Sequence, residues 1–190
     1  MKAHFAQGVI CFLLLLLFTA TGIAQLNSND ATVTLTATLP ESLTVTVNSG
    51  AAVSFPLVAN TAANAGSTTT GITAAWVLKP SRTSVALWAY FNSSAQALLH
   101  QTAGNTTDIP SAAVAIQLNG SGPFNALTNV SPFNAAASGL QLGSSIAITA
   151  ANKNSSITDT LGYQINTTVV PQLQADTYIG TLNIQAQATP

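Results

Sequence analysis

Apolar and polar residues alternate along much of this chain with a period of two. In residues 31–39, alanine, valine and leucine hold the odd positions and threonine holds every even one. After Pro40 the odd phase continues from Leu43 to Val47. This alternation, with β-branched residues on the polar face, is typical of a half-buried strand. Proline has no backbone N–H to donate, so we expect the strand to bend at Pro40.

Similar short alternating segments recur up to residue 188. Clusters of Gly, Pro, Asn and Ser separate them, and none has a helical period; they cover residues 53–58, 72–78, 84–91, 114–118, 140–142, 146–148, 161–165 and 178–188. About nine short strands with turns between them predict an all-β fold, an immunoglobulin-like β-sandwich. A closed β-barrel is the alternative.

Residues 79–82 (Lys-Pro-Ser-Arg) are typical of a turn and lie between the segments 72–78 and 84–91. We therefore expect residues 72–78 and 84–91 to pair as an antiparallel hairpin. Both faces of residues 84–91 are apolar, which favours a central position in a sheet. Trp76 shares its phase with Leu78, so we expect it in the core.

The first residues are typical of a secretory signal peptide. Lys2 precedes an unbroken apolar run over residues 9–18, which is too short for a bilayer span, and Gly22 and Ala24 are the small residues of a cleavage site. We expect a signal peptide over residues 1–24 and a single β-sandwich domain over residues 25–190. The protein would then be exported, to the periplasm, cell surface or extracellular space, with no membrane span after signal removal.

Charged residues make up only 5% of the chain, against about a quarter in typical soluble domains. After processing, the cations would be Lys79, Arg82 and Lys153. So few positive charges exclude the basic patch that nucleic-acid binding requires. A nearly neutral surface also favours association between copies.

The mature chain offers little chemistry. His100 is its single histidine and Cys11 leaves with the signal peptide, so no disulfide or thiolate site is predicted. There is no nucleophile motif, no pair of carboxylates placed for hydrolysis and no cluster of metal ligands. We therefore predict no catalytic residue, no cofactor and no metal, with His100 in a solvated loop; the protein is predicted not to be an enzyme.

Two aromatic residues form a candidate binding face. Trp88 and Tyr90 lie opposite Leu87 and Ala89 in the strand pattern. If exposed, they would offer rings on which a glycan can stack; the alternative is that they pack against the second face of the strand.

Both ends of the chain resemble a known family. Residues 31–47 (ATVTLTATLPESLTVTV), followed by residues 53–55, are similar to the opening of spore-coat-protein-U-like domains, which include archaic chaperone–usher pilins. Residues 175–188 (ADTYIGTLNIQAQA) resemble the final strand of that family. At the position of Leu43 the family often has a disulfide-bonded cysteine.

The resemblance implies a cell-surface subunit that polymerises when an N-terminal strand of one copy completes the sheet of its neighbour. The inserted face would be Ala31, Val33, Leu35 and Ala37; alternatively, this strand belongs to its own sandwich. We expect a secreted or surface-displayed structural subunit, fimbria- or coat-like, whose partners are copies of itself or other surface subunits. The alternative is a non-catalytic binding module for glycan or another cell-envelope component.

Overall fold

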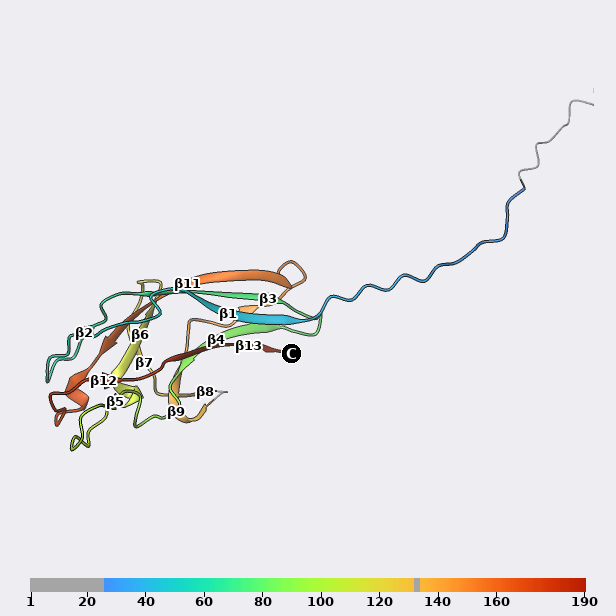
Figure 1. Ribbon diagram of the computed structural model, residues 1–190. Helices are drawn as coiled ribbons and strands as arrows, with labels where there is room; N and C mark the ends of the chain where they lie inside the picture. The colour runs from blue at the N-terminus through green and yellow to red at the C-terminus, as the bar shows by residue number, and fades with distance from the viewer. Residues whose placement is uncertain (1–25, 132–133) are drawn as a thin grey trace, which may run out of the picture. The chain divides into compact units, whose positions relative to one another are not determined.

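The computed structural model describes residues 26–131 and 134–190. The chain divides into two units, residues 1–38 and residues 39–190. The second unit is an all-β sandwich of antiparallel sheets whose edges stay open, which confirms the predicted fold class over a closed barrel (Figure 1). Within the described residues, no helix has the length and apolar character needed to cross a bilayer.

The first sheet has the strand order β1-β3-β11-β6-β7, and β2 pairs with β11. Every pairing in it is antiparallel. Its strands are β1 (Ser42–Ser49), β2 (Asn64–Ala65), β3 (Thr70–Val77), β6 (Val114–Leu118), β7 (Asn125–Ala126) and β11 (Asn154–Ile165).

In the second sheet β4 pairs with β9 and β10 along one edge and with β13 along the other, so its predicted central position is confirmed. The strands are β4 (Ser84–Tyr90), β8 (Asn129–Ser131), β9 (Asn134–Gln141), β10 (Ile146–Ala147) and β13 (Asn183–Thr189). A small third sheet joins β5 (Leu99–His100) to β12 (Tyr178–Ile179), and two short 3₁₀ helices are η1 (Ser111–Ala113) and η2 (Thr167–Val169).

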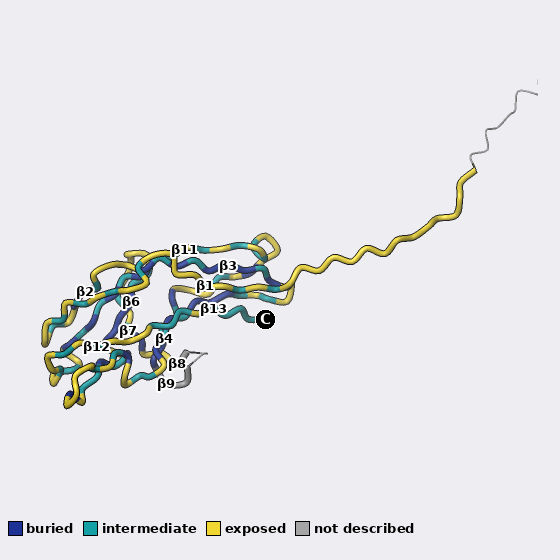
Figure 2. The backbone as a smooth tube through the Cα atoms, in the orientation of Figure 1, coloured by how far each residue is buried: buried dark blue, intermediate teal, exposed yellow. Residues whose placement is uncertain are grey.

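The core forms where the inward faces of the two large sheets meet (Figure 2). On β3 the alternation is complete, since Ile72, Ala74 and Trp76 are buried while the residues between them are half-buried. The prediction that Trp76 is a core residue is confirmed: its side chain is buried and its indole N–H donates to the carbonyl of Asn152 (2.8 Å). That bond satisfies the one polar group of a buried indole.

The predicted hairpin of residues 72–78 with 84–91 is wrong. The two strands form, but β3 belongs to the first sheet and β4 to the second. Each strand has a strongly buried face. The two buried faces pack against each other across the core, so the strands lie in facing sheets and do not pair as neighbours in one sheet. The turn at residues 79–82 therefore carries the chain from one layer to the other.

The strand predicted over residues 31–39 does not pair in the structure. Residues 26–41 lie in no strand, and the sheet begins only at Ser42. The apolar side chains of this stretch are left in solvent: Val33 is 81% exposed and Leu35 is 89% exposed. Alternation defines two faces of a strand, but a strand also needs a neighbouring backbone to accept its hydrogen bonds. We call residues 26–39 the N-terminal segment.

Candidate functional site

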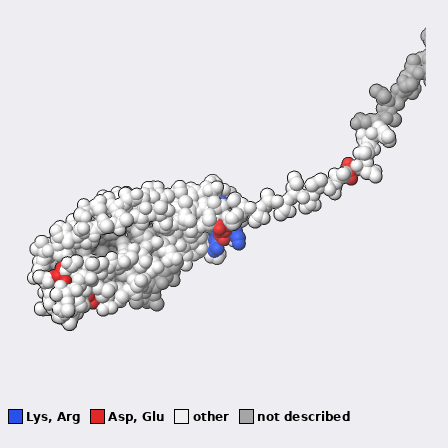
Figure 3. Space-filling model, viewed as in Figure 1, with Lys and Arg blue, Asp and Glu red and all other residues white. Residues whose placement is uncertain are grey.

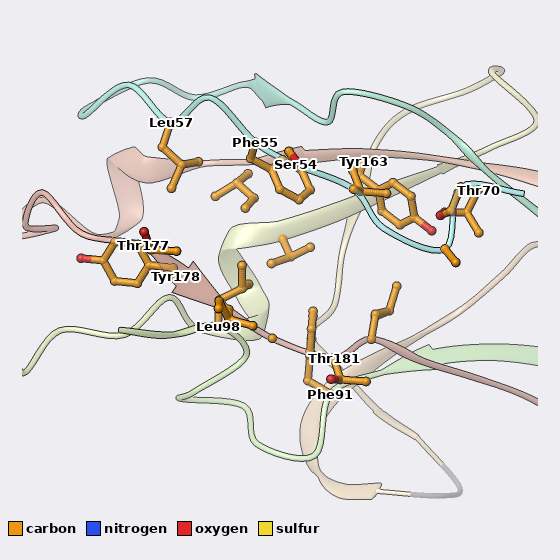
Figure 4. A pocket seen from close by; sticks show the side chains of 18 of the residues that line it. Ser54, Phe55, Leu57, Thr70, Phe91, Leu98, Tyr163, Thr177, Tyr178 and Thr181 are labelled. Carbon is orange, nitrogen blue, oxygen red and sulfur yellow. The ribbon is translucent and has the colours of Figure 1, made fainter. Parts of the chain in front are cut away.

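A groove of about 700 Å³ opens in the side of the sandwich, within residues 39–190 (Figure 4). One wall is the stretch from Gly50 to Leu57 and the other is residues 176–184. Its remaining lining is largely apolar and comes mostly from core residues: Val47, Thr70, Phe91, Leu98, Val114, Tyr163 and Ile165. This volume lies in the range of ligand cavities, but here both walls are lengths of backbone.

The first wall is an edge without a neighbour. Ser54 points its backbone groups away from the groove, donating to Ser67 Oγ (3.1 Å) and accepting from the Ser67 N–H (2.8 Å). Because successive residues of an extended chain direct their backbone groups to opposite edges, those of Val53 and Phe55 face the other way. Among the described residues, neither backbone has a hydrogen-bond partner. The strand predicted over residues 53–58 is therefore wrong, because this stretch joins no ladder.

A buried amide fixes the far end of this wall. Asn64 is 4% exposed; its Oδ1 accepts from the N–H of Val58 (2.7 Å) and its Nδ2 donates to the carbonyl of Ile165 (2.9 Å). The Thr167 hydroxyl, also buried, donates to the carbonyl of Val58 (2.7 Å). Together these bonds tie the wall to β11 on the side away from the groove.

We expect Asn64→Ala to lower the free energy of unfolding by about 2–3 kcal/mol, because it removes a buried side chain that bonds to the N–H of Val58 and to the carbonyl of the buried Ile165. Urea denaturation measures the change. Asn154→Ala is the matched control: Asn154 is exposed on β11, so its loss should stay within about 0.5 kcal/mol. Equal effects from the two substitutions would contradict the anchoring role.

The second wall is also a free edge. Among the described residues, β13 pairs with β4 alone, and β12 pairs with β5 alone. Between β12 and β13, the backbones of Gly180, Thr181 and Leu182 make no hydrogen bond within the described chain. A Cβ at Gly180 would collide with the backbone of Ala97, so this position is restricted to glycine. Leu182 and Ile184 contribute apolar side chains to the groove.

The chemistry of the groove suits an extended peptide. Unpaired backbone on both walls offers donors and acceptors in a row, and the apolar lining offers surface for every second side chain. Burial raises the pKa of the Tyr163 hydroxyl, so the floor is uncharged at neutral pH. The exception is Asp176 at one end, whose pKa is held well below its usual range by the amide of Asn105 and by Thr102.

The candidate strand-addition residues have the matching pattern. Ala31, Val33, Leu35 and Ala37 are all exposed in the N-terminal segment and share one phase. In an extended strand, alternate side chains on one face lie about 6.6 Å apart. Threonine fills the opposite phase at residues 32–38, so one side of such a strand is apolar and the other is polar.

The candidate aromatic face is half-buried. Trp88 and Tyr90 lie on the outer face of β4, where Trp88 is paired between Gln141 of β9 and Gln185 of β13. The Tyr90 hydroxyl donates to Gln185 Oε1 (3.2 Å), whereas the Trp88 indole N–H is buried without a partner in the described chain. Neighbouring side chains thus cover part of both residues.

The single histidine of residues 25–190 is not in the solvated loop predicted for it. His100 ends β5, and its Nδ1 lies 2.7 Å from Asp108 Oδ1. The backbone N–H of His100 and the side chain of Gln96 also bond to Asp108, and the backbone bond is the main cause of a lowered Asp108 pKa. These contacts close the loop between β5 and η1. No group of three metal-ligating side chains occurs among the described residues.

Comparison with protein-family models, with curated proteins and with solved structures finds no match for this chain.

Proposed function

We propose that this protein is a structural subunit of an exported surface or coat assembly, and that the N-terminal segment of one copy fills the groove of another. The inserted strand would bond to the free edges on both walls and place Val33 and Leu35 against the apolar floor. The physical basis is strand addition, in which backbone hydrogen bonds supply affinity and alternate side chains supply fit.

The observation that carries this proposal is that the same chain contains both a groove with unpaired edges and a strand-like segment without a sheet. The groove lacks a strand along two edges, and residues 31–39 have a strand pattern without a sheet. An exposed alternating segment is costly to leave in water, because each Val or Leu gains about 1.5–3 kcal/mol on burial. A groove with free edges in the same chain is a natural place for that burial.

Export and a role at the cell surface are supported by sequence. Residues 1–24 have the pattern of a signal peptide, and both ends of the chain resemble coat and pilin subunits. The low content of charged residues reduces repulsion between copies. These features favour an assembling subunit over an isolated binding module.

The experiment compares two lengths of the chain by sedimentation across a range of concentrations. The chain from residue 25 is expected to form multimers, whereas the chain from residue 39 is expected to stay monomeric and folded. Sedimentation of both as monomers would overturn the proposal, and so would multimers of the shorter chain. Insertion of the segment into its own groove would leave the longer chain monomeric, and so also counts against it.

A further inference from the structure

All three cations of residues 26–190 lie at one end of the sandwich, around the turn between β3 and β4 (Figure 3). Arg82 Nε lies 2.9 Å from Glu41 Oε1, and Lys79 reaches the same carboxylate at 4.0 Å. Lys153 donates to the carbonyls of Pro80 (2.9 Å) and Arg82 (2.7 Å). We call Lys79, Arg82, Lys153 and Glu41 the cationic end.

Pro190 lies at the cationic end too, since the Thr83 hydroxyl donates to its backbone oxygen (2.6 Å). Among the charged side chains there, three are cations and one, Glu41, is an anion. This is also the end at which β1 begins, because Glu41 precedes Ser42 directly. The N-terminal segment is therefore joined to the sandwich at its cationic end.

Two carboxylates, Asp108 and Asp176, lie beside β5 and the loop that follows it: Asp108 bonds to His100, and Asp176 bonds to Thr102 and Asn105. We call them the anionic end, and acidic atoms are visible at the end of the sandwich opposite the cations (Figure 3). His100 connects them, because it bonds to Asp108 and pairs with Tyr178, two residues from Asp176. The chain runs from this end to the cationic end along β12 and β13, from Tyr178 to Thr189. At about 3.3 Å per residue that run is roughly 35 Å long.

Both carboxylates keep their charge at neutral pH. The pKa of Asp176 is held far below its usual range by Asn105 and Thr102, and that of Asp108 is lowered by the N–H of His100 and by Gln96. No lysine or arginine lies near them in residues 26–190, since all three belong to the cationic end. The subunit thus has ends of opposite sign.

On the basis of the proposed function, we propose that the cationic end of one copy meets the anionic end of the next. The inserted strand of the first copy then runs antiparallel to β12 and β13 of the second. An inserted strand can enter the groove in two directions. In the antiparallel direction, residue 39 of the donor lies at the anionic end of the acceptor and brings the donor's own cationic end beside it. In the parallel direction the two cationic ends would meet and repel.

Asp30 favours the same direction. It is the one charged residue of the N-terminal segment and lies nine residues before Leu39, or about 30 Å in an extended strand. In the antiparallel direction Asp30 falls near Arg82 of the acceptor. In the parallel direction it falls beside Asp108 and Asp176, where like charges oppose insertion.

The antiparallel direction also fits the shape of the groove. When Leu39 of the donor lies beside Tyr178 of the acceptor, Leu35 lies beside Leu182 and Val33 lies beside Ile184. Ala37 then lies beside Gly180, where the nearby backbone of Ala97 leaves no room for a side chain. An alanine, the smallest apolar residue type in the segment, thus meets the position that has no side chain.

Disulfide trapping between copies tests the direction. Residues 25–190 contain no cysteine, and Cys11, if retained, is replaced by serine. A protein with Thr38→Cys is mixed with one carrying Ile179→Cys, an exposed position on the acceptor wall. We expect this mixture to form a disulfide-linked heterodimer at least about tenfold faster than a mixture of Thr32→Cys with Ile179→Cys, because residues 32 and 38 are roughly 20 Å apart in a strand. The reverse preference would overturn the proposal.

Charge reversal tests the contact between ends. Assembly after dilution from urea is followed by light scattering, and Lys79→Glu or Ala103→Lys, both exposed, should each slow it roughly tenfold at low salt. The double variant Lys79→Glu/Ala103→Lys should recover to within about threefold of the wild type, and about 0.5 M salt should remove the differences. Lys79→Gln and Ala103→Gln are the neutral controls.

The outcomes separate this inference from the proposed function. If Leu35→Asp stops assembly but the charge variants match the wild type, the ends do not meet as proposed, and strand addition stands. A double variant slower than both single variants also overturns the inference. If neither Leu35→Asp nor the charge variants alter assembly, both proposals fail.

Discussion

Leu35→Asp is expected to weaken association between copies at least about 1,000-fold while leaving the sandwich as stable as before. Insertion would bury the leucine, which contributes about 2–3 kcal/mol, and the aspartate would instead place a carboxylate against an apolar floor. A combined loss of about 4 kcal/mol corresponds to that factor. Leu35 is 89% exposed, so its replacement removes no packing from the isolated chain. Sedimentation equilibrium measures association, and thermal unfolding measures the fold.

The matched control is Thr36→Asp, on the opposite phase of the same segment. Its carboxylate would face water after insertion, so we expect less than about a fivefold change, within the range of surface charge effects. The difference between the Leu35 and Thr36 variants distinguishes strand insertion from non-specific hydrophobic association of an apolar tail. Comparable losses for both variants would contradict a strand with one buried face.

A synthetic peptide of residues 27–39 is expected to stabilise the chain that begins at residue 39. Binding to the folded state alone adds about 2.7 kcal/mol when the free peptide is at 100 times its Kd. For domains of 150–250 residues each kcal/mol raises Tm by about 2–4 °C, so we expect roughly 5–10 °C. Differential scanning calorimetry over a peptide titration measures the shift. The shortened chain should fold, since the removed residues pair with no strand.

The control peptide has the same composition with Val33 and Thr34 exchanged and Leu35 and Thr36 exchanged. The exchanges move the two largest apolar side chains to the opposite face, and a one-residue change of phase reverses which face is apolar. We expect a shift below about 2 °C. An equal shift from the control peptide would show that hydrophobicity alone, without strand register, accounts for binding.

Local pattern was sufficient to predict the fold class. Alternation over residues such as 72–78 and 161–165 reports one buried and one polar face, and this is the property that places a strand on a core. The buried Trp76 and the central β4 followed from the same reasoning. Sheet membership did not, because the turn at residues 79–82 is as compatible with a crossing between layers as with a hairpin.

The groove was beyond prediction from sequence because it is defined by neighbours that are missing. Residues 53–58 and residues 31–39 have similar strand patterns, yet neither joins a ladder in the structure. The even-numbered positions Ser54 and Val58 bond instead to Ser67 and Asn64, which leaves the opposite edge open. Alternation alone does not state which backbone a strand will meet.

The free edges and the exposed segment of each copy have a consequence for the size of any assembly. The joint proposed above uses two unlike surfaces, a strand on one copy and a groove on the next. Contacts of this heterologous kind produce an open filament unless the rotation between neighbours closes a ring. Every filament would then expose one unfilled groove and one unused strand at its tips. Its length would be set by protein concentration or by a terminating protein that has only the groove or only the strand.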